Sequence, residues 1–121
     1  MPIAIGMDLV GVDEVEAAIH VHGERYLHRV YTDRERRECG DNPRQLAARF
    51  AAKEATMKIL RVSDEPLAWR TIAVSGGAHP AVELTGDAAA LAELRGVRRL
   101  SVSLADRKSA AAAVVVGEMG R

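Results

Sequence analysis

The chain has 121 residues, 48% of them apolar and 28% charged, which suits one globular core because single domains usually hold roughly 100–200 residues. Seventeen Lys and Arg balance seventeen Asp and Glu, and 3% of residues are aromatic, which argues against binding nucleic acid through bulk charge or base stacking. Cys39 is the single cysteine, and no stretch approaches the ~20 apolar residues of a membrane span. We expect one cytoplasmic domain over residues 1–121, without a membrane or nucleic-acid partner.

The predicted elements give a strand, then helices, then a region rich in strands. Bulky and small residues alternate over the first ten positions, which indicates a strand, and Thr32 with Glu35 forms the capping-box signature of a helix start. Pro43 favours the start of the longest helix. The prediction is a strand over 3–10, helices over 12–30 (broken near Gly23), 33–39 and 44–61, strands over 69–75 and 80–85, a helix over 86–96, and strands over 98–104 and 110–116. This order predicts an α+β fold with a mostly antiparallel sheet and one long helix.

The helix over 44–61 carries an acid and a base beside its predicted apolar face. At about 100° per residue, Leu46, Phe50 and Met57 fall on one stripe, which we expect to face the core. Glu54 and Lys58 flank this stripe, and their neighbours on that flank are alanines. The pattern therefore predicts a shallow recess that presents one acidic and one basic side chain.

Each of these charges also has a purely structural interpretation. Glu54 and Lys58 are spaced as a surface ion pair of one helix turn, and Asp8, near the end of a strand, is placed to cap the next helix. Two carboxylates from separate elements are also enough to hold Mg²⁺. Arg49 and Lys53 add positive charge on the other side of the apolar face. The pattern alone leaves these alternatives open.

Two segments of the chain resemble the signature motifs of a known family. Residues 5–10 read I-G-M-D-L-V, and residues 48–55 read A-R-F-A-A-K-E-A. They resemble the motifs of holo-acyl carrier protein synthase, the small single-domain class of 4′-phosphopantetheinyl transferases. Residues 24–35 are similar to the intervening helices of that family, and L-S-V-S-L over 100–104 to its late strand. The resemblance covers nearly the whole chain.

The resemblance implies an activity, a metal and an assembly. The family transfers phosphopantetheine from coenzyme A to a serine of an acyl carrier protein and releases 3′,5′-adenosine diphosphate. It implies that Asp8 and Glu54 are catalytic residues that hold Mg²⁺, that Lys58 is catalytic near the phosphates, and that the protein is a homotrimer with sites at subunit interfaces. Two carboxylates, a metal and a lysine suit phosphoryl transfer, which depends on positioning and charge neutralisation. The residues expected to bind coenzyme A are Arg49, Lys53, Lys58, Ser103 and Asp106.

Three positions depart from the family pattern. Asp106 stands where the late-strand motif has a histidine, residues 60–66 lack the glycines of the family's phosphate loop, and Glu14 replaces a basic residue that grips the acidic carrier protein. These departures suggest slow transfer or one specialised carrier. They leave open a scaffold that binds a carrier or synthase without catalysis, and a hydrolase or nucleotide-binding module that uses the same metal.

Overall fold

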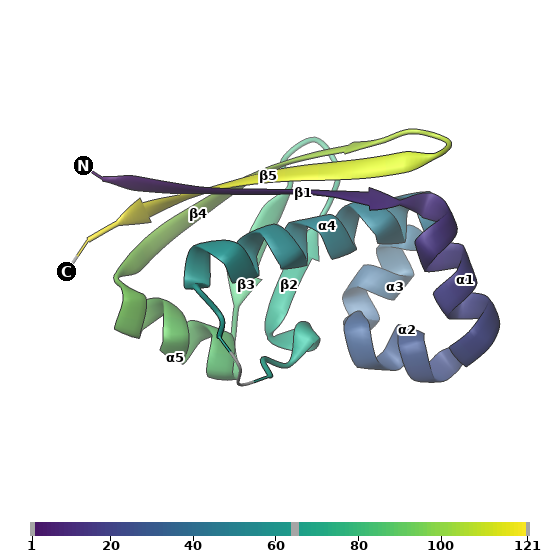
Figure 1. Ribbon diagram of the computed structural model, residues 1–121, viewed down its shortest axis with the longest axis horizontal. Coiled ribbons are helices and arrows are strands. Elements are labelled where there is room, and N and C mark those ends of the chain that lie inside the picture. The colour runs from purple at the N-terminus through teal and green to yellow at the C-terminus, as the bar shows by residue number, and fades with distance from the viewer. Residues whose placement is uncertain (1, 64–65, 121) are drawn as a thin grey trace.

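The computed structural model describes residues 2–63 and 66–120. A three-stranded antiparallel sheet, in the order β1-β5-β4, forms one layer, and the helices lie on one side of it (Figure 1). The elements in chain order are β1 (Ile3–Gly11), α1 (Val12–His22), α2 (Glu24–Val30), α3 (Asp33–Cys39), α4 (Pro43–Leu60), the short 3₁₀ helix η1 (Trp69–Thr71), β2 (Ile72–Ser75), β3 (Ala81–Leu84), α5 (Gly86–Arg95), β4 (Val97–Asp106) and β5 (Ala110–Met119). This arrangement confirms the predicted α+β fold.

Strand β1 has two unlike faces, as its alternating sequence predicts. The small residues at positions 4, 6, 8 and 10 face helix α4, and Asp8 lies opposite Ala113 of β5. The bulky residues face away from every described helix, so that Ile5 is 64% exposed and Leu9 is 71% exposed. One side of the three-stranded sheet is therefore covered by the fold, and the other side remains bare, apolar along β1 and more polar along β4.

Helix α4 packs on this sheet through small side chains. Its alanines are buried, and a Cβ added at Gly6 of β1 would collide with the backbone carbonyl oxygen of Ala55. The predicted core-facing stripe is confirmed for Leu46, which is buried, whereas Phe50 and Met57 pack against the core but are only partly buried. A glycine on the strand and alanines on the helix allow a close approach of the two backbones, and this approach turns the larger side chains outward.

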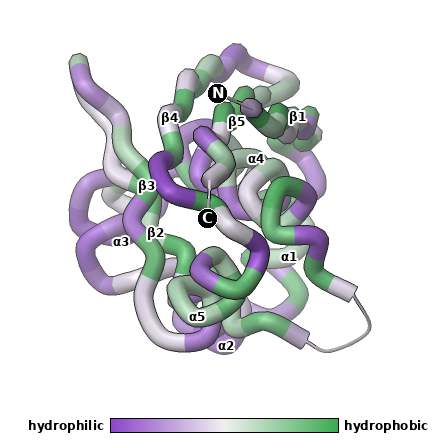
Figure 2. The backbone as a smooth tube through the Cα atoms, turned by 90° about the vertical axis from the view of Figure 1, so that its left-hand side faces the viewer, coloured by the Kyte–Doolittle hydropathy of each residue, from purple (hydrophilic) through white to green (hydrophobic). Residues whose placement is uncertain are grey.

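The three short helices agree with the local signals in the sequence. The chain breaks between α1 and α2 at Gly23, whose φ of 56° is left-handed, and α3 begins with the predicted capping box. The Glu35 carboxylate accepts from the Thr32 backbone N–H at 2.8 Å, and the Glu35 N–H donates back to the Thr32 hydroxyl at 3.1 Å. Helix α3 is hydrophilic along most of its length (Figure 2), yet Glu35 is buried.

The second half forms the β2–β3 hairpin, helix α5 and the β4–β5 hairpin. The predicted strand over 69–75 is correct only from Ile72, because residues 69–71 form a 3₁₀ turn. Within this turn, Ala68 supplies a carbonyl that accepts from both the N–H and the hydroxyl of Thr71. The alanine run at 110–113 lies in a strand, as predicted. No helix in the described ranges is both long and apolar enough to cross a bilayer.

Candidate active site

Asp8 and Glu54 meet where strand β1 crosses helix α4. Their carboxyl groups lie close enough for hydrogen bonding with Asp8 to contribute to the raised pKa of Glu54. The exposed Lys58 ammonium, one turn along the helix, donates to Asp8 Oδ1 at 3.1 Å and to the Met7 carbonyl at 2.8 Å. The Asp8 side chain is 19% exposed and that of Lys58 is 57% exposed. Two acids and one base therefore converge from two elements at the surface.

The surroundings of Glu54 disfavour its negative charge. Burial, the hydrogen bond with Asp8 and the charge of Asp8 together raise the pKa of Glu54 to about 7. The Lys58 ammonium opposes this rise, while Glu14 of α1 adds to it. Three acids thus act on one place with one nearby ammonium, so a proton or a metal cation at Glu54 relieves their repulsion.

Both structural interpretations of these charges fail. The ammonium of Lys58 pairs with Asp8 and not with Glu54, among the ion pairs of the described residues. Asp8 does not cap helix α1, whose N-cap residue is Gly11 and has no side-chain cap. The charges instead connect the strand to the long helix, as a binding site requires and a surface pair does not.

The donor set of Asp8 and Glu54 fits Mg²⁺. Oxygen ligands suit this hard cation, which typically takes one or two protein carboxylates and keeps other positions for water and phosphate. Burial, followed by the hydrogen bond and the charge of Asp8, raises the pKa of Glu54, and a bound cation would offset the charges of the two carboxylates. In the described part of the chain, His, Cys, Asp and Glu side chains form no metal-binding group of three or more.

Lys53 does not reach this site, although it precedes Glu54 directly. Its side chain is 0% exposed, and its ammonium lies 2.9 Å from Glu35 Oε1. Burial lowers the pKa of Lys53, while the Glu35 carboxylate favours the charged form. This position contradicts the expectation that Lys53 contacts coenzyme A, because no ligand can touch an enclosed ammonium.

Arg49 is also buried, but it is not satisfied. Its side chain is 8% exposed, and its closest ion pair joins Nη2 to Glu38 Oε1 at 3.6 Å. The buried Nε atom has no hydrogen-bond partner among residues 2–63 and 66–120. The guanidinium lies against Gly76, where an added Cβ would collide with it. Arg49 therefore keeps donor capacity that the protein itself does not use.

Ser103 and Asp106 lie away from the carboxylates of their own chain. Ser103 pairs with Val114, which lies opposite Met7, so its side chain is on the bare face of the sheet. Asp106 ends strand β4, where its Oδ1 is 3.1 Å from Nη2 of Arg44. The expectation that both residues line the site does not hold within one chain, and Arg44 offsets the charge of Asp106.

A cavity of about 380 Å³ next to Glu54 was not predicted. Its aromatic floor comes from three elements, and the rings of Phe50 and Trp69 stack at 4.9 Å. Glu54 lies one helical turn beyond Phe50, and its charge raises the pKa of Tyr26, although burial of Tyr26 is the main cause. The lining residues are His22, Arg25, Tyr26, Arg29, Val30, Phe50 and Trp69. The spacing of the two arginines, four positions apart on one helix face, is the sequence signal that could have found it.

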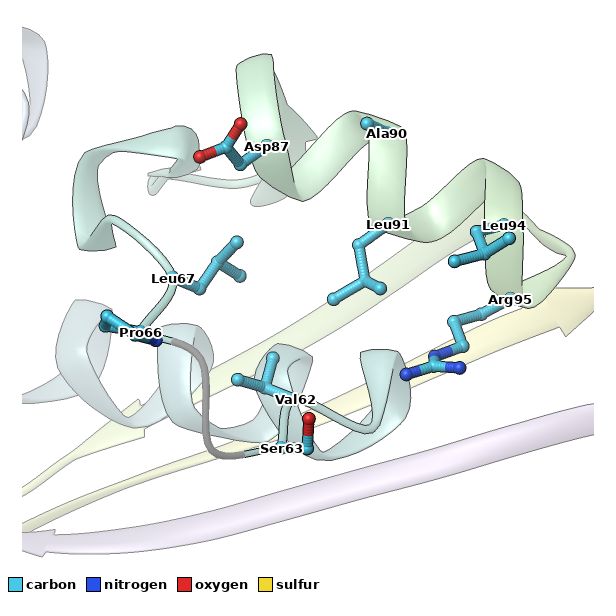
Figure 3. A pocket seen from close by; sticks show the side chains of 9 residues that line it. All are labelled: Val62, Ser63, Pro66, Leu67, Asp87, Ala90, Leu91, Leu94 and Arg95. Carbon is cyan, nitrogen blue, oxygen red and sulfur yellow. The ribbon is translucent and has the colours of Figure 1, made fainter.

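A second cavity, of about 570 Å³, lies between helix α5 and the segment that follows α4 (Figure 3). Arg95 at its edge donates to the carbonyls of Leu60 and Arg61, which satisfies acceptors at the end of α4. The predicted departure at residues 60–66 falls partly on Asp64 and Glu65, which are outside the described residues. Val62 and Leu67 contribute apolar side chains to this cavity.

The chain is similar to known proteins along nearly its whole length. Residues 4–115 match the family model of the 4′-phosphopantetheinyl transferase superfamily. A holo-[acyl-carrier-protein] synthase from Herpetosiphon aurantiacus is 37% identical over 124 aligned positions, which cover 95% of this chain and 98% of the relative. One from Chlamydia muridarum is 35% identical, with coverages of 95% and 94%.

Solved structures agree with these sequence relatives. The holo-[acyl-carrier-protein] synthase of Helicobacter pylori in complex with coenzyme A superposes with a TM-score of 0.83 at 27% identity, covering 95% of this chain and all of the other. The corresponding enzyme of Neisseria meningitidis gives 0.81 at 30% identity, with coverages of 94% and 96%. The chain therefore belongs to the holo-acyl carrier protein synthase family of 4′-phosphopantetheinyl transferases.

Proposed function

We propose that this protein transfers 4′-phosphopantetheine from coenzyme A to a serine of an acyl carrier protein, with Asp8, Glu54 and Lys58 as its catalytic group. In this reaction the serine hydroxyl loses its proton and its oxygen bonds to the phosphorus that carries pantetheine. The bond from that phosphorus to the bridging oxygen breaks, and the oxygen leaves with its electron pair as part of 3′,5′-adenosine diphosphate. The observation that carries the proposal is the meeting of two carboxylates and an ammonium at one accessible place. Phosphoryl transfer needs positioning and charge neutralisation more than covalent chemistry from the protein.

Asp8 and Glu54 are the residues that would hold Mg²⁺. When bound, the ion would neutralise charge on the pyrophosphate and help to orient it. Lys58 has an exposed ammonium that can leave Asp8 for a phosphate oxygen once a cation takes its place. Arg49 supports a further contact with a phosphate of coenzyme A, because its buried Nε has no partner in the described part of the chain.

The proposal includes a homotrimer with sites between copies. The bare apolar face formed by Ile3, Ile5, Met7, Leu9 and Val114 supports it, because a contiguous apolar patch on a soluble protein usually marks an interface. When a second copy packs on this face, Ser103 and Asp106 of one copy could lie near Asp8 and Glu54 of the other, although they lie away from these carboxylates in their own chain. Light scattering should give three times 13.0 kDa, and a clean monomer at micromolar concentration would contradict both the trimer and the shared site.

The carrier protein is expected at the cavity lined by Phe50 and Trp69. Three cationic or titratable side chains, His22, Arg25 and Arg29, surround its aromatic floor, and an acidic partner suits this rim. The cavity lies one helical turn from Glu54, so a carrier docked there can present its serine to the proposed metal site. Glu14 stands on α1 near the same site, and its charge favours a carrier with fewer acidic groups at that point.

Mass spectrometry of candidate apo-carriers tests the function directly. We expect each true substrate to gain one phosphopantetheine group when it is incubated with the protein, coenzyme A and Mg²⁺, and to remain unmodified when the metal is chelated. Failure to modify any carrier while coenzyme A still binds would refute the transferase assignment. Equal transfer with and without the metal would refute the assignment of Asp8 and Glu54 as its ligands.

A further inference from the structure

Lys53 and Glu35 form an ion pair that is enclosed by the protein. Their side chains are 0% and 2% exposed. The Lys53 ammonium uses all three of its donors, on Glu35 Oε1 and on the carbonyls of Trp69 and Ile72. The Glu35 carboxylate accepts in turn from the backbone N–H groups of Thr32 and Val74. The pair is thus fully hydrogen-bonded.

This pair fastens the turn η1 to helix α4 at a defined position. Two of the three bonds from the ammonium reach the carbonyl of Trp69, the first residue of η1, and that of Ile72, which directly follows η1. The ring of Trp69 then lies on the ring of Phe50, with centroids 4.9 Å apart and planes inclined by 33°. Phe50 is on the same helix, three residues before Lys53. One buried side chain therefore connects the backbone of Trp69 to the helix that carries its stacking partner.

A purely stabilising role does not account for the ion pair. Replacing a buried ion pair with apolar residues of similar volume is often neutral or stabilising, because two charges must be removed from water to form it. Helix α4 already has a buried alanine face against the sheet. An apolar side chain at position 53 could fill the same space, but it could not donate to the carbonyls of η1. The capacity that only the ammonium provides is to hold that turn.

We propose that Lys53, together with Glu35, is a positioning residue that holds the Trp69 ring against Phe50. It thereby fixes one wall of the groove, as we call the cavity of about 380 Å³ that both rings line one helical turn from Glu54. The occupant of that groove, an acyl carrier protein, rests on the proposed function. The position of the wall does not, because it follows from contacts within the described chain. Lys53 acts from inside the core and touches no substrate.

Tryptophan fluorescence tests the wall itself, since Trp69 is the only tryptophan of the chain. In the double variant Glu35→Gln, Lys53→Met, which removes both charges and leaves neither one buried alone, we expect a red-shifted emission and stronger quenching by acrylamide. The conservative Lys53→Arg variant keeps a cation with several donors, so its emission should shift less than that of the double variant. Thr56→Val is the matched control, because Thr56 is also 0% exposed in α4 and its hydroxyl donates only to the Ala52 carbonyl. Unchanged emission and quenching in a folded double variant would overturn the proposal.

Steady-state kinetics with natural protein and variants then separate the wall from its occupant. We expect the double variant to raise KM for the apo-carrier about tenfold, a factor that corresponds to 1.4 kcal/mol, while KM for coenzyme A and kcat change little. Equal losses for both substrates, or a loss confined to kcat, would contradict the role in positioning. A red shift without any change in KM for the carrier would support the positioning of Trp69 and refute the assignment of the groove to the carrier.

If the double variant does not fold, Lys53→Arg must itself show a red-shifted emission, and a spectrum identical to that of the natural protein would count against the proposal.

Discussion

Lys53 and Glu54 are consecutive residues of helix α4, yet their surroundings are opposite. Lys53 lies in a closed region where one carboxylate and two carbonyls match its charge. Glu54 is half-buried beside Asp8, and burial together with the charges of Asp8 and Glu14 raises its pKa to about 7. The fold satisfies the first charge and leaves the second one unsatisfied. This difference shows which of the two is available to a ligand.

Helix geometry explains how neighbours can differ so much. Successive side chains project about 100° apart, so a residue that faces the interior is followed by one that faces the rim. The partner of Lys53 comes from α3, and the partners of Glu54 come from β1 and α1. The following predictions test this contrast, from the largest expected effect to the smallest.

The substitution Glu54→Gln should have the largest effect on transfer. It keeps the shape of the side chain and removes its charge, so we expect Mg²⁺-dependent transfer to fall by at least about 10³-fold, or ~4 kcal/mol of transition-state stabilisation. The folded structure should persist, since a partly exposed isosteric change usually alters stability by well under ~1 kcal/mol. Mass spectrometry of the apo-carrier gives the rate. Glu93→Gln, an exposed change on α5, is the control, and unchanged Mg²⁺ affinity in Glu54→Gln would contradict the metal assignment.

The substitution Gly6→Ala should separate the two carboxylates. The added methyl group collides with the Ala55 carbonyl, so strand β1 must move away from α4 and take Asp8 with it. A misplacement of 1 Å can lower a rate by about 10²-fold, and we expect a loss of that size together with a destabilisation of about 1–3 kcal/mol. Transfer assays and urea unfolding measure the two effects. Gly120→Ala, where the methyl meets only the flexible Arg98 side chain, should leave both unchanged.

The substitution Asp106→His should increase transfer by roughly tenfold, or about 1.4 kcal/mol. We expect the natural protein to be slow, because this acid adds negative charge near the pyrophosphate when a neighbouring copy brings it to the site. Its ion pair with Arg44 already offsets part of that charge. Asp106→Asn separates the loss of the acid from the gain of the imidazole. A slower Asp106→His enzyme would show that the pair with Arg44 is needed where it is.

The pH dependence of folding should show the smallest effect. The pKa of Glu54 rises from an ordinary 4.5 to about 7 in the folded chain, so the associated stability is fully present below pH 4.5 and is lost as the pH rises through 7. Urea midpoints of the natural protein should therefore fall relative to Glu54→Gln across this window at constant protein concentration. Saturating Mg²⁺ should reduce that fall, and parallel profiles without metal would contradict the strained state of Glu54.

Local signals in the sequence predicted most of the secondary structure. The capping box of Thr32 and Glu35 and the alternation along β1 depend on neighbours in the chain, and the structure confirms both. The turn at residues 69–71 was predicted as strand, because its helical form depends on hydrogen bonds from Thr71 and Lys53 that the alternation of side chains does not encode.

The site was predictable only in part. The resemblance indicated Asp8 and Glu54, whereas their spacing in the sequence could not show that a strand and a helix 46 positions apart bring them together. Lys53 was predicted to lie beside the apolar face with Arg49 and, from the resemblance, to bind coenzyme A, because nothing local in the sequence reveals a buried partner on α3. Phe50 and Met57 were assigned to the core because they fall on the apolar stripe of the helical wheel. In the structure, Ala55 makes the closest contact between helix α4 and Gly6 of β1.

Strand β1 carries Asp8, the proposed metal ligand, on one side and the bare apolar residues on the other. Any surface that covers Ile5, Met7 and Leu9 therefore also restrains the backbone around Asp8. We expect cation binding on one side of the strand and association through the other to be linked, and such linkage is reciprocal: a cation that favours association by some factor is itself bound more tightly by the same factor after association. We therefore expect dilution, which separates the copies, to weaken cation binding, and removal of the metal to weaken association of the copies.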